Sequence, residues 1–250
     1  MIVIYALLGL LSGAFLNLAA DHLPQRHSIL NPPRCSYCKG EWGLIDTISL
    51  LSFVLLRGRC PHCGAPHPWR RPLLELVTML SFAFLWQRYG PSLQLILITM
   101  YICVLFLVFV IDLEHRLILH VVMLPAIALA ILASLVYPGM GWRRALLGGA
   151  FAFVFFYLVV IIGRLLFRRT AMGGGDVNLA AFIGLITGFP DIILALIIAI
   201  SLGGLVSLIL ILVRVKKLRS YIPYGVFLVV GGLAVLIFGQ EILAWYFGLY

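Results

Sequence analysis

Residues 93–112 read LQLILITMYICVLFLVFVID, an almost unbroken apolar run that ends on an aspartate. A helix needs about 20 mostly apolar residues to cross a hydrocarbon core of about 30 Å, and this run has that length. The rest of the chain has the same character, because 63% of its 250 residues are hydrophobic, 11% are charged and the mean hydropathy is +1.13. Soluble domains are only about half apolar. The sequence therefore predicts an integral membrane protein.

Similar apolar stretches recur along the chain and predict an all-α, polytopic fold with about eight transmembrane helices. We place the spans near residues 2–20, 73–88, 92–111, 119–137, 145–163, 177–189, 191–213 and 223–238. The first stretch is interpreted as a permanent span and not as a secretory signal, because the first basic residue, Arg26, comes after it. Without a repeat of solenoid period, residues 1–250 are expected to form a single integral-membrane domain.

The basic residues predict the orientation of these spans. Of the 18 Lys and Arg residues, only Arg88, Arg143 and Arg144 fall on one side of the membrane in this arrangement. Positive charge concentrates on the cytoplasmic side, so the amino terminus is expected outside and residues 21–72 in a cytoplasmic loop. Attraction to anionic lipid accounts for the net charge of +9, and we expect membrane lipid, and no nucleic acid, as its partner.

Four of the five cysteines lie in that loop, in the pairs Cys35-Ser-Tyr-Cys38 and Cys60-Pro-His-Cys63. This spacing indicates a tetrahedral zinc site, with Cys35, Cys38, Cys60 and Cys63 as ligands. Four sulfurs leave no open position for water, so the zinc would be structural. Two disulfides are the alternative, which a reducing cytoplasm disfavours. His62 and His67 are close enough in sequence to replace a ligand.

The text around the cysteines predicts local features of the loop. Leu44–Leu56 is apolar but too short to span comfortably, so an interfacial or re-entrant helix is expected there. That arrangement keeps both cysteine pairs on one face of the membrane. Gly40 and Gly64 follow the two pairs, where a positive φ is often needed. Cys103 stands alone in an apolar span and is expected to be a small buried hydrophobe.

Two aspartates are the candidate catalytic groups. Asp112 lies in LVFVIDLEHRLI (residues 107–118) and Asp176 in AMGGGDVNLAAF (residues 171–182), both at predicted cytoplasmic ends of spans. A carboxylate at such a place is costly and suggests function. Two carboxylates in hydrogen-bond reach tend to share one proton, so that one activates water while the other polarises a scissile carbonyl. The glycines before Asp176 would leave room for a substrate backbone.

Structural roles are the alternatives for both residues. Asp176 could be the N-cap of a helix, and Asp112 could pair with Arg116 or His115. Glu75, at the mouth of the second span, is a candidate for binding a methyl donor but is expected to pair with Arg70 or Arg71. The sequence has no Walker loop, no G-x-S-x-G elbow and no H-E-x-x-H helix, which disfavours nucleotide binding and serine or zinc proteolysis.

In order and along nearly the whole chain, these residues resemble the bacterial type IV prepilin peptidases, a family of bifunctional leader peptidases and N-methyltransferases with a GxGD motif. The matching stretches are Gly13–Asn17 with Leu23-Pro24, Leu50–Ser52, Leu56–Ala65, Pro72–Leu76, Ile111–His115, Gly173–Val177 and Ile222–Gly225. The chain departs from the family at Asn178, where lysine is usual, at Asp21-His22, where a basic residue is usual, and at Thr47–Ser49, which lacks a common proline.

The resemblance implies an enzyme of the bacterial inner membrane with its active site facing the cytoplasm. It would cleave the basic leaders of type IV prepilins and pseudopilins with Asp112 and Asp176, in an aspartyl protease core over residues 92–238. It would then methylate the new amino terminus from S-adenosylmethionine. The alternatives are a presenilin-like intramembrane protease without methyltransferase activity, a proton-coupled small transporter with paired carboxylates, and a scaffold without enzymatic activity.

Overall fold

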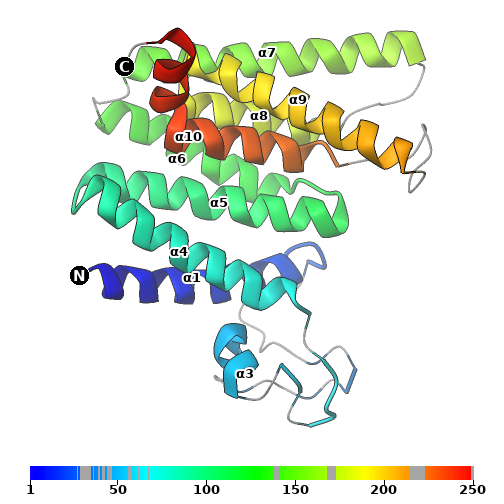
Figure 1. Cartoon of the computed structure of the whole chain (residues 1–250). Coiled ribbons are helices and arrows are strands. Elements are labelled where there is room, and N and C mark those ends of the chain that lie inside the picture. Colours follow the sequence, from blue (N-terminus) through cyan, green and yellow to red (C-terminus); the bar gives the residue numbers. More distant parts are fainter. Residues whose placement is uncertain are drawn as a thin grey trace. The chain divides into compact units, whose positions relative to one another are not determined.

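The chain folds into α-helices in a computed structural model (Figure 1). The structure describes residues 1–26, 28, 35, 37–38, 40, 43, 47–55, 58–60, 62–66, 68–137, 141–167, 173–213 and 223–248. Its helices are α1 (Ile2–His22), α3 (Ser49–Leu55), α4 (Arg70–Tyr89), α5 (Leu93–His115), α6 (His120–Val136), α7 (Trp142–Phe167), α8 (Gly174–Thr187), α9 (Asp191–Leu212) and α10 (Gly225–Phe247). Apart from an isolated bridge between Arg59 and Pro66, the described residues show no strand pairing, which confirms the all-α prediction.

A helix lies at each of the eight predicted spans, and five of them are long and apolar enough to cross a membrane. These five are α1, α5, α7, α9 and α10, so the chain is a multi-pass membrane protein. The apolar helices α6 and α8 have only 17 and 14 residues, and α4 carries several charges. The span count of eight therefore stays a prediction. The seven-residue α3 lies within the expected interfacial segment, of which residues 44–46 and 56 fall outside the described residues.

The chain forms two compact units, unit 1 at Met1–Leu107 and unit 2 at Val108–Tyr250. In unit 1, α1 and α4 pack side by side and run in opposite directions (Figure 1). Gly9 and Gly13 let the two backbones approach, because a Cβ at Gly9 would lie 2.9 Å from Met79 Cα and one at Gly13 would lie 2.7 Å from Glu75 Cα. Small residues four apart are a common way to bring membrane helices together.

In unit 2, the short helix α8 packs against α6, α7, α9 and α10. Its residues from Leu179 to Ile186 are all buried. Gly148 of α7 and Gly184 of α8 meet backbone to backbone, so neither position has room for a side chain. A helix that other helices cover on every side can be apolar all round. The 14-residue α8 is of this kind, and it therefore holds the aspartate near its amino end in the interior of the unit.

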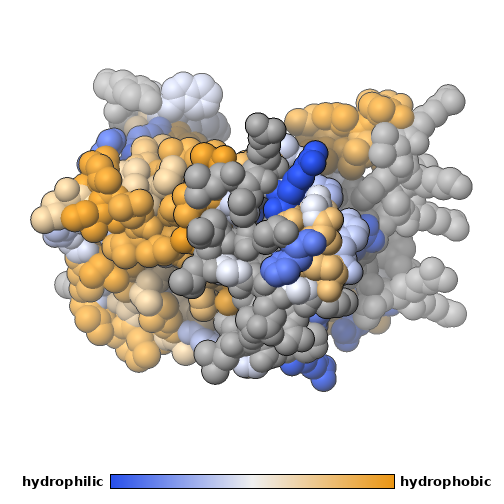
Figure 2. Space-filling model, turned by 90° about the horizontal axis from the view of Figure 1, so that it is seen from below, coloured by the Kyte–Doolittle hydropathy of each residue, from blue (hydrophilic) through white to orange (hydrophobic). Residues whose placement is uncertain are grey.

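Large apolar side chains are exposed along the outer faces of the helices. On α1 they include Val3, Ile4, Leu7, Leu8 and Leu11. Figure 2 shows apolar side chains, in orange, gathered over one side of the face seen from below. Exposed apolar surface of this extent requires a nonaqueous environment, and lipid supplies it.

Candidate active site and metal centre

The four loop cysteines converge in unit 1. Their sulfur atoms all lie within 4.8 Å of one another, and all four thiols are free of disulfides. Cys35 Sγ lies 3.8 Å from Cys63 Sγ, and Cys38 Sγ lies 3.9 Å from Cys60 Sγ. A tetrahedron of sulfurs around zinc at about 2.3 Å has edges of about 3.8 Å. The cluster therefore fits a tetrahedral metal ion, and the alternative of two disulfides is wrong for this structure.

The loop backbone holds the two cysteine pairs in place. The Cys35 N–H donates to the Gly40 carbonyl at 3.0 Å, and the Cys60 N–H donates to the Ala65 carbonyl at 2.9 Å. Gly64 has the predicted positive φ, 71°. The same prediction is wrong for Gly40, whose φ is not positive and where a Cβ would meet Cys38 Sγ and the His62 ring at an ordinary contact distance of 3.4 Å.

The thiols differ in acidity before any metal binds. The Cys38 backbone N–H, helped by that of Tyr37 and opposed by burial, lowers the pKa of Cys35 to about 7. The Ala65 N–H acts on Cys63 in the same direction, but loss of hydration and the neighbouring thiols raise the pKa of Cys63 to about 12. Four thiolates this close repel one another, and a divalent cation removes that repulsion. His62 is exposed and outside the cluster, and His67 lies outside the described residues.

Both candidate aspartates lie in unit 2, and both are buried. Asp112 lies three residues before the end of α5 and is 3% exposed, and Asp176 is the third residue of α8 and is 5% exposed. The charge of Asp112 acts on Asp176. Ile118 lies close to the neighbours of both aspartates. Its side chain is 2.7 Å from where a Cβ at Gly175 would lie and 3.0 Å from where a Cβ at Gly225 would lie. The fold thus brings together two carboxylates that are far apart in sequence.

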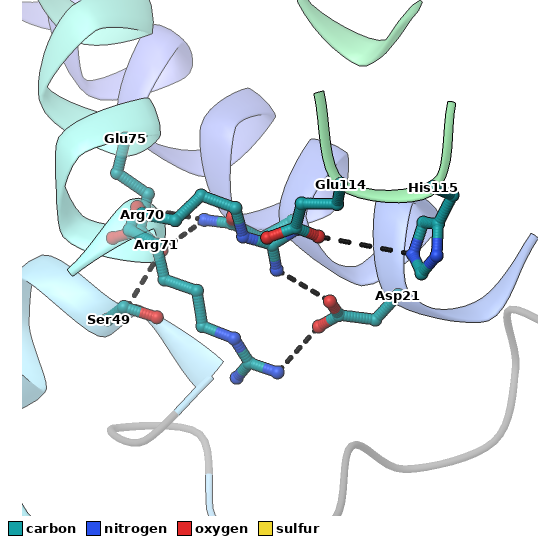
Figure 3. A network of polar contacts seen from close by, with 8 residues as sticks. Asp21, Ser49, Arg70, Arg71, Glu75, Glu114 and His115 are labelled. Atoms are coloured by element: carbon teal, nitrogen blue, oxygen red, sulfur yellow. Dashed lines mark hydrogen bonds and ion pairs between the residues drawn. The ribbon is translucent and has the colours of Figure 1, made fainter. Parts of the chain in front are cut away.

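The structural alternatives for these aspartates are wrong. Gly173, not Asp176, is the N-cap of α8, and the Asp176 carboxylate accepts the backbone N–H of this N-cap from the third position of the helix. In the described part of the chain Asp112 makes no ion pair with Arg116 or His115, and the His115 ring instead lies 4.0 Å from Glu114 (Figure 3). The glycine run also has a packing role, because Gly175 lies against Ile118 whereas Gly173 and Gly174 are exposed.

Sequence reasoning missed what holds Asp112. Its Oδ2 accepts the Val226 N–H at 3.0 Å, at the start of α10. The Tyr224 phenol, just before this helix, is within electrostatic range of Asp176. In the sequence, Pro223–Gly225 stood out only because the stretch Ile222–Gly225 resembles the family. Ile222 itself lies outside the described residues. The pattern of the sequence does not show that this stretch meets an aspartate 114 residues away.

A third buried carboxylate, Glu75, lies in unit 1 and has a different environment. Its oxygens accept the Ser49 N–H at 2.9 Å, the Leu50 N–H at 2.7 Å and the Asn17 amide at 3.3 Å. The expected ion pair of Glu75 with Arg70 or Arg71 is wrong. Figure 3 shows both guanidinium groups on Asp21 instead, each at 2.5 Å. Glu75 therefore attaches α3 to α4.

Comparison with known proteins gives matches along most of the chain. Residues 7–89 match the bacterial peptidase A24 N-terminal domain, and residues 99–208 match the type IV leader peptidase family. The first range lies within unit 1, and most of the second range lies within unit 2.

Curated relatives carry the name prepilin leader peptidase/N-methyltransferase. That of Legionella pneumophila is 30% identical over 86% of this chain and 75% of the relative. That of Myxococcus xanthus is 33% identical over 82% of this chain and 62% of the relative, and that of Bacillus subtilis is 28% identical over 98% of both. No solved structure matches the chain.

Proposed function

Because the chain belongs to the type IV leader peptidase family, we propose that it cleaves the leaders of type IV prepilins and pseudopilins and methylates the new amino terminus. Asp112 and Asp176 are the catalytic pair. The observation that supports this most is that both carboxylates are buried in unit 2, at the ends of two apolar helices, where the charge of Asp112 acts on Asp176 although the two are 64 residues apart in sequence. We assign the protease core to residues 92–238.

The pair hydrolyses a peptide bond by general acid–base chemistry. One carboxylate, ionised, takes a proton from water as the water oxygen attacks the scissile carbonyl carbon. The other, protonated, donates to the carbonyl oxygen, where negative charge develops. Burial favours a shared proton, because two negative charges this close in a poorly hydrated site repel strongly.

The position of the pair suits a substrate that is half in lipid. Asp112 lies near the end of α5, and Asp176 lies in the first turn of α8. A prepilin whose apolar helix lies in the bilayer, with its charged leader in water, presents its scissile bond at that depth. A proton-coupled transporter would instead need carboxylates near the middle of its spans. The enzyme acts at the inner membrane of a bacterium, with this site facing the cytoplasm.

The cysteine cluster binds a structural zinc ion. Cys35, Cys38, Cys60 and Cys63 would hold it, and the closed set of four sulfurs leaves no position for substrate or water. A bound ion ties together the two cysteine pairs, between which α3 is the only helix that the described residues form. The loop of residues 21–72, held by the ion, contributes to leader selection.

The methyl donor implied by the family is S-adenosylmethionine, which would supply an electrophilic methyl group. Glu75 does not fit as a binding group for this cationic donor, because its carboxylate already accepts two backbone N–H groups and the Asn17 amide. Glu75 therefore has a structural role and is not part of a methyl-donor site.

Cleavage of a purified type IV prepilin in detergent tests the proposal. Asp112→Asn and Asp176→Asn are each expected to lower the cleavage rate by about 10²–10⁴-fold. Asp191→Asn is the matched control, because Asp191 also lies in the first turn of a helix in unit 2, and it should change the rate by less than about threefold. Methyl incorporation into an already cleaved pilin is scored separately. Normal cleavage by either variant of the pair would remove the assignment.

A further inference from the structure

A four-residue stretch beside the catalytic pair is neither helix nor turn. Residues 116–119, the connecting segment, join the end of α5 to the start of α6, and Leu119 has extended backbone angles, φ −79° and ψ 124°. Arg116 has a φ of 54°, which is uncommon for a residue with a side chain. Such a conformation persists only where the surrounding structure holds it, and residues of this kind gather at functional sites.

The connecting segment lies against the neighbours of both aspartates. A Cβ at Gly175, next to Asp176, would lie 2.7 Å from Ile118 Cβ. A Cβ at Gly225 would lie 3.0 Å from Ile118 Cδ1 and 2.6 Å from Asp112 Oδ2. Glycine at both positions therefore lets the segment approach the pair closely, from the start of α8 and from the start of α10.

The backbone of the connecting segment has unused hydrogen-bonding groups. Among the described residues, none accepts the N–H of Leu117 or Ile118, and none donates to the carbonyl of either. Helix α6 uses the Leu119 carbonyl, which accepts the N–H groups of Val122 and Met123 at 3.1 and 3.0 Å. Because Leu117 is exposed and Ile118 is half-buried, their backbone groups need partners from water or from a bound molecule.

One edge of the connecting segment is open. In an extended chain the N–H and C=O of one residue point to the same edge, and those of the next residue point to the other. The Ile118 carbonyl faces the start of α8, because a Cβ at Gly175 would lie 3.0 Å from this oxygen. The N–H and C=O of Leu117 therefore point to the opposite edge, in agreement with the 51% exposure of Leu117.

The substrate has the complementary need. The peptide groups of an apolar prepilin helix are hydrogen-bonded within the helix, so the bond to be cut must be unwound before two carboxylates and a water molecule can reach it. Unwinding frees N–H and C=O groups in a poorly hydrated site, where a polar group without a partner is costly. A peptide that adds itself to a free strand edge regains these hydrogen bonds.

We propose that the connecting segment binds the unwound stretch of a prepilin as an added β-strand, with the N–H and C=O of Leu117 paired to a substrate residue near the scissile bond. This inference rests on the proposed peptidase function and deepens it, because it names the part of the chain that holds the substrate backbone. Main-chain pairing of this kind supplies affinity and sets the register of the scissile carbonyl against Asp112 and Asp176, whereas sequence preference comes from side-chain contacts.

An N-methyl scan of the substrate tests the pairing with the unaltered enzyme. The substrate is a synthetic peptide that carries the leader and the first apolar residues of a prepilin, N-methylated at one residue at a time on both sides of the scissile peptide group. Each methyl group removes one N–H donor. Strand pairing predicts that kcat/KM falls by at least about threefold at alternate residues only. Equal losses at neighbouring residues, or no loss at any residue, would overturn the inference.

Replacement of Leu117 by its α-hydroxy acid tests the enzyme side of the pairing. The change exchanges the N–H for an oxygen and keeps the side chain, and it should lower kcat/KM by about threefold to tenfold, mainly through a higher KM. The matched control is the same exchange at Val121, because its N–H is one of the first of α6 and has no partner within the helix. This control should change kcat/KM by less than about twofold.

The two experiments separate the possible failures. No effect at Leu117, or an equal effect at Val121, would overturn the assignment of the pairing to Leu117. If the Leu117 variant does not fold, the substrate scan alone decides, and normal cleavage without alternation would mean that water and not the substrate satisfies the connecting segment. Absence of cleavage of the unmethylated peptide by the wild type would contradict the proposed function itself.

Discussion

The two units bury carboxylates in opposite ways. In unit 1, Glu75 is fully buried and its oxygens are taken by two backbone N–H groups and the Asn17 amide. In unit 2, each aspartate has a single backbone donor, the Val226 N–H for Asp112 and the Gly173 N–H for Asp176. A buried polar group that the protein satisfies stabilises the fold, whereas one left unsatisfied needs another explanation. Glu75 is thus a structural residue, and the aspartates remain available to water and substrate.

Loss of the metal is expected to have the largest effect and to be confined to unit 1. The double variant Cys35→Ser, Cys60→Ser should contain less than about 0.1 zinc per chain, because two of four ligands are lost and structural zinc in small domains contributes about 10–16 kcal/mol. The loop should become sensitive to protease. For prepilin cleavage, the rise in KM should be larger than the fall in kcat. Elemental analysis and limited proteolysis measure this.

Cys103→Ser is the control for the metal prediction, because Cys103 lies in α5 and outside the cluster. It should keep about one zinc per chain, as a closed four-sulfur site predicts. Undiminished zinc in the double variant would contradict the assignment of the cluster.

Exchanging the buried carboxylates for alanine tests the comparison directly. Glu75→Ala leaves the Ser49 and Leu50 N–H groups buried without an acceptor, at a cost of about 1–3 kcal/mol each. Its thermal midpoint in detergent should fall by several degrees. Asp176→Ala removes one of two repelling groups and should not lower the midpoint. Equal losses in the two variants would remove the distinction between the units.

The glycine run before Asp176 should show a graded effect on cleavage. Gly175→Ala should lower the cleavage rate at least about tenfold, because its Cβ would lie 2.7 Å from Ile118 Cβ and 3.0 Å from the Ile118 carbonyl. The start of α8 would then shift and carry Asp176 with it. Gly174→Ala meets nothing within 4 Å and should cost less than about threefold. The reverse order would mean that substrate approach, and not packing, requires the glycines.

The ion pair of Asp21 should have the smallest effect. Arg70 and Arg71 both contact Asp21, whose side chain is 27% exposed. Partly exposed ion pairs contribute about 1 kcal/mol and are screened by salt. Asp21→Asn should lower the thermal midpoint by a few degrees at low salt and by less at high salt, with prepilin cleavage within about twofold of wild type. A loss that salt does not change would point to packing instead of charge.

The sequence by itself determined where the helices lie and which side chains carry chemistry. The apolar runs predicted a helix at each span because the cost of placing a residue in lipid depends mainly on that residue and its near neighbours. The paired cysteines predicted the cluster for the same reason, since two C-x-x-C turns already bring sulfurs together locally. The burial cost of Asp112 and Asp176 marked them before their surroundings were known.

Only the tertiary structure decided what these groups contact. The Val226 N–H meets Asp112 across 114 residues, and Glu75 meets the start of α3 across 25 or 26. The sequence suggested an ion pair between Glu75 and a nearby arginine, and an N-cap role for Asp176. Both suggestions came from residues that are neighbours in the linear sequence, namely opposite charges and glycines. Which helix end faces which side chain depends instead on how whole helices pack, and that is set by many distributed contacts that no short stretch contains.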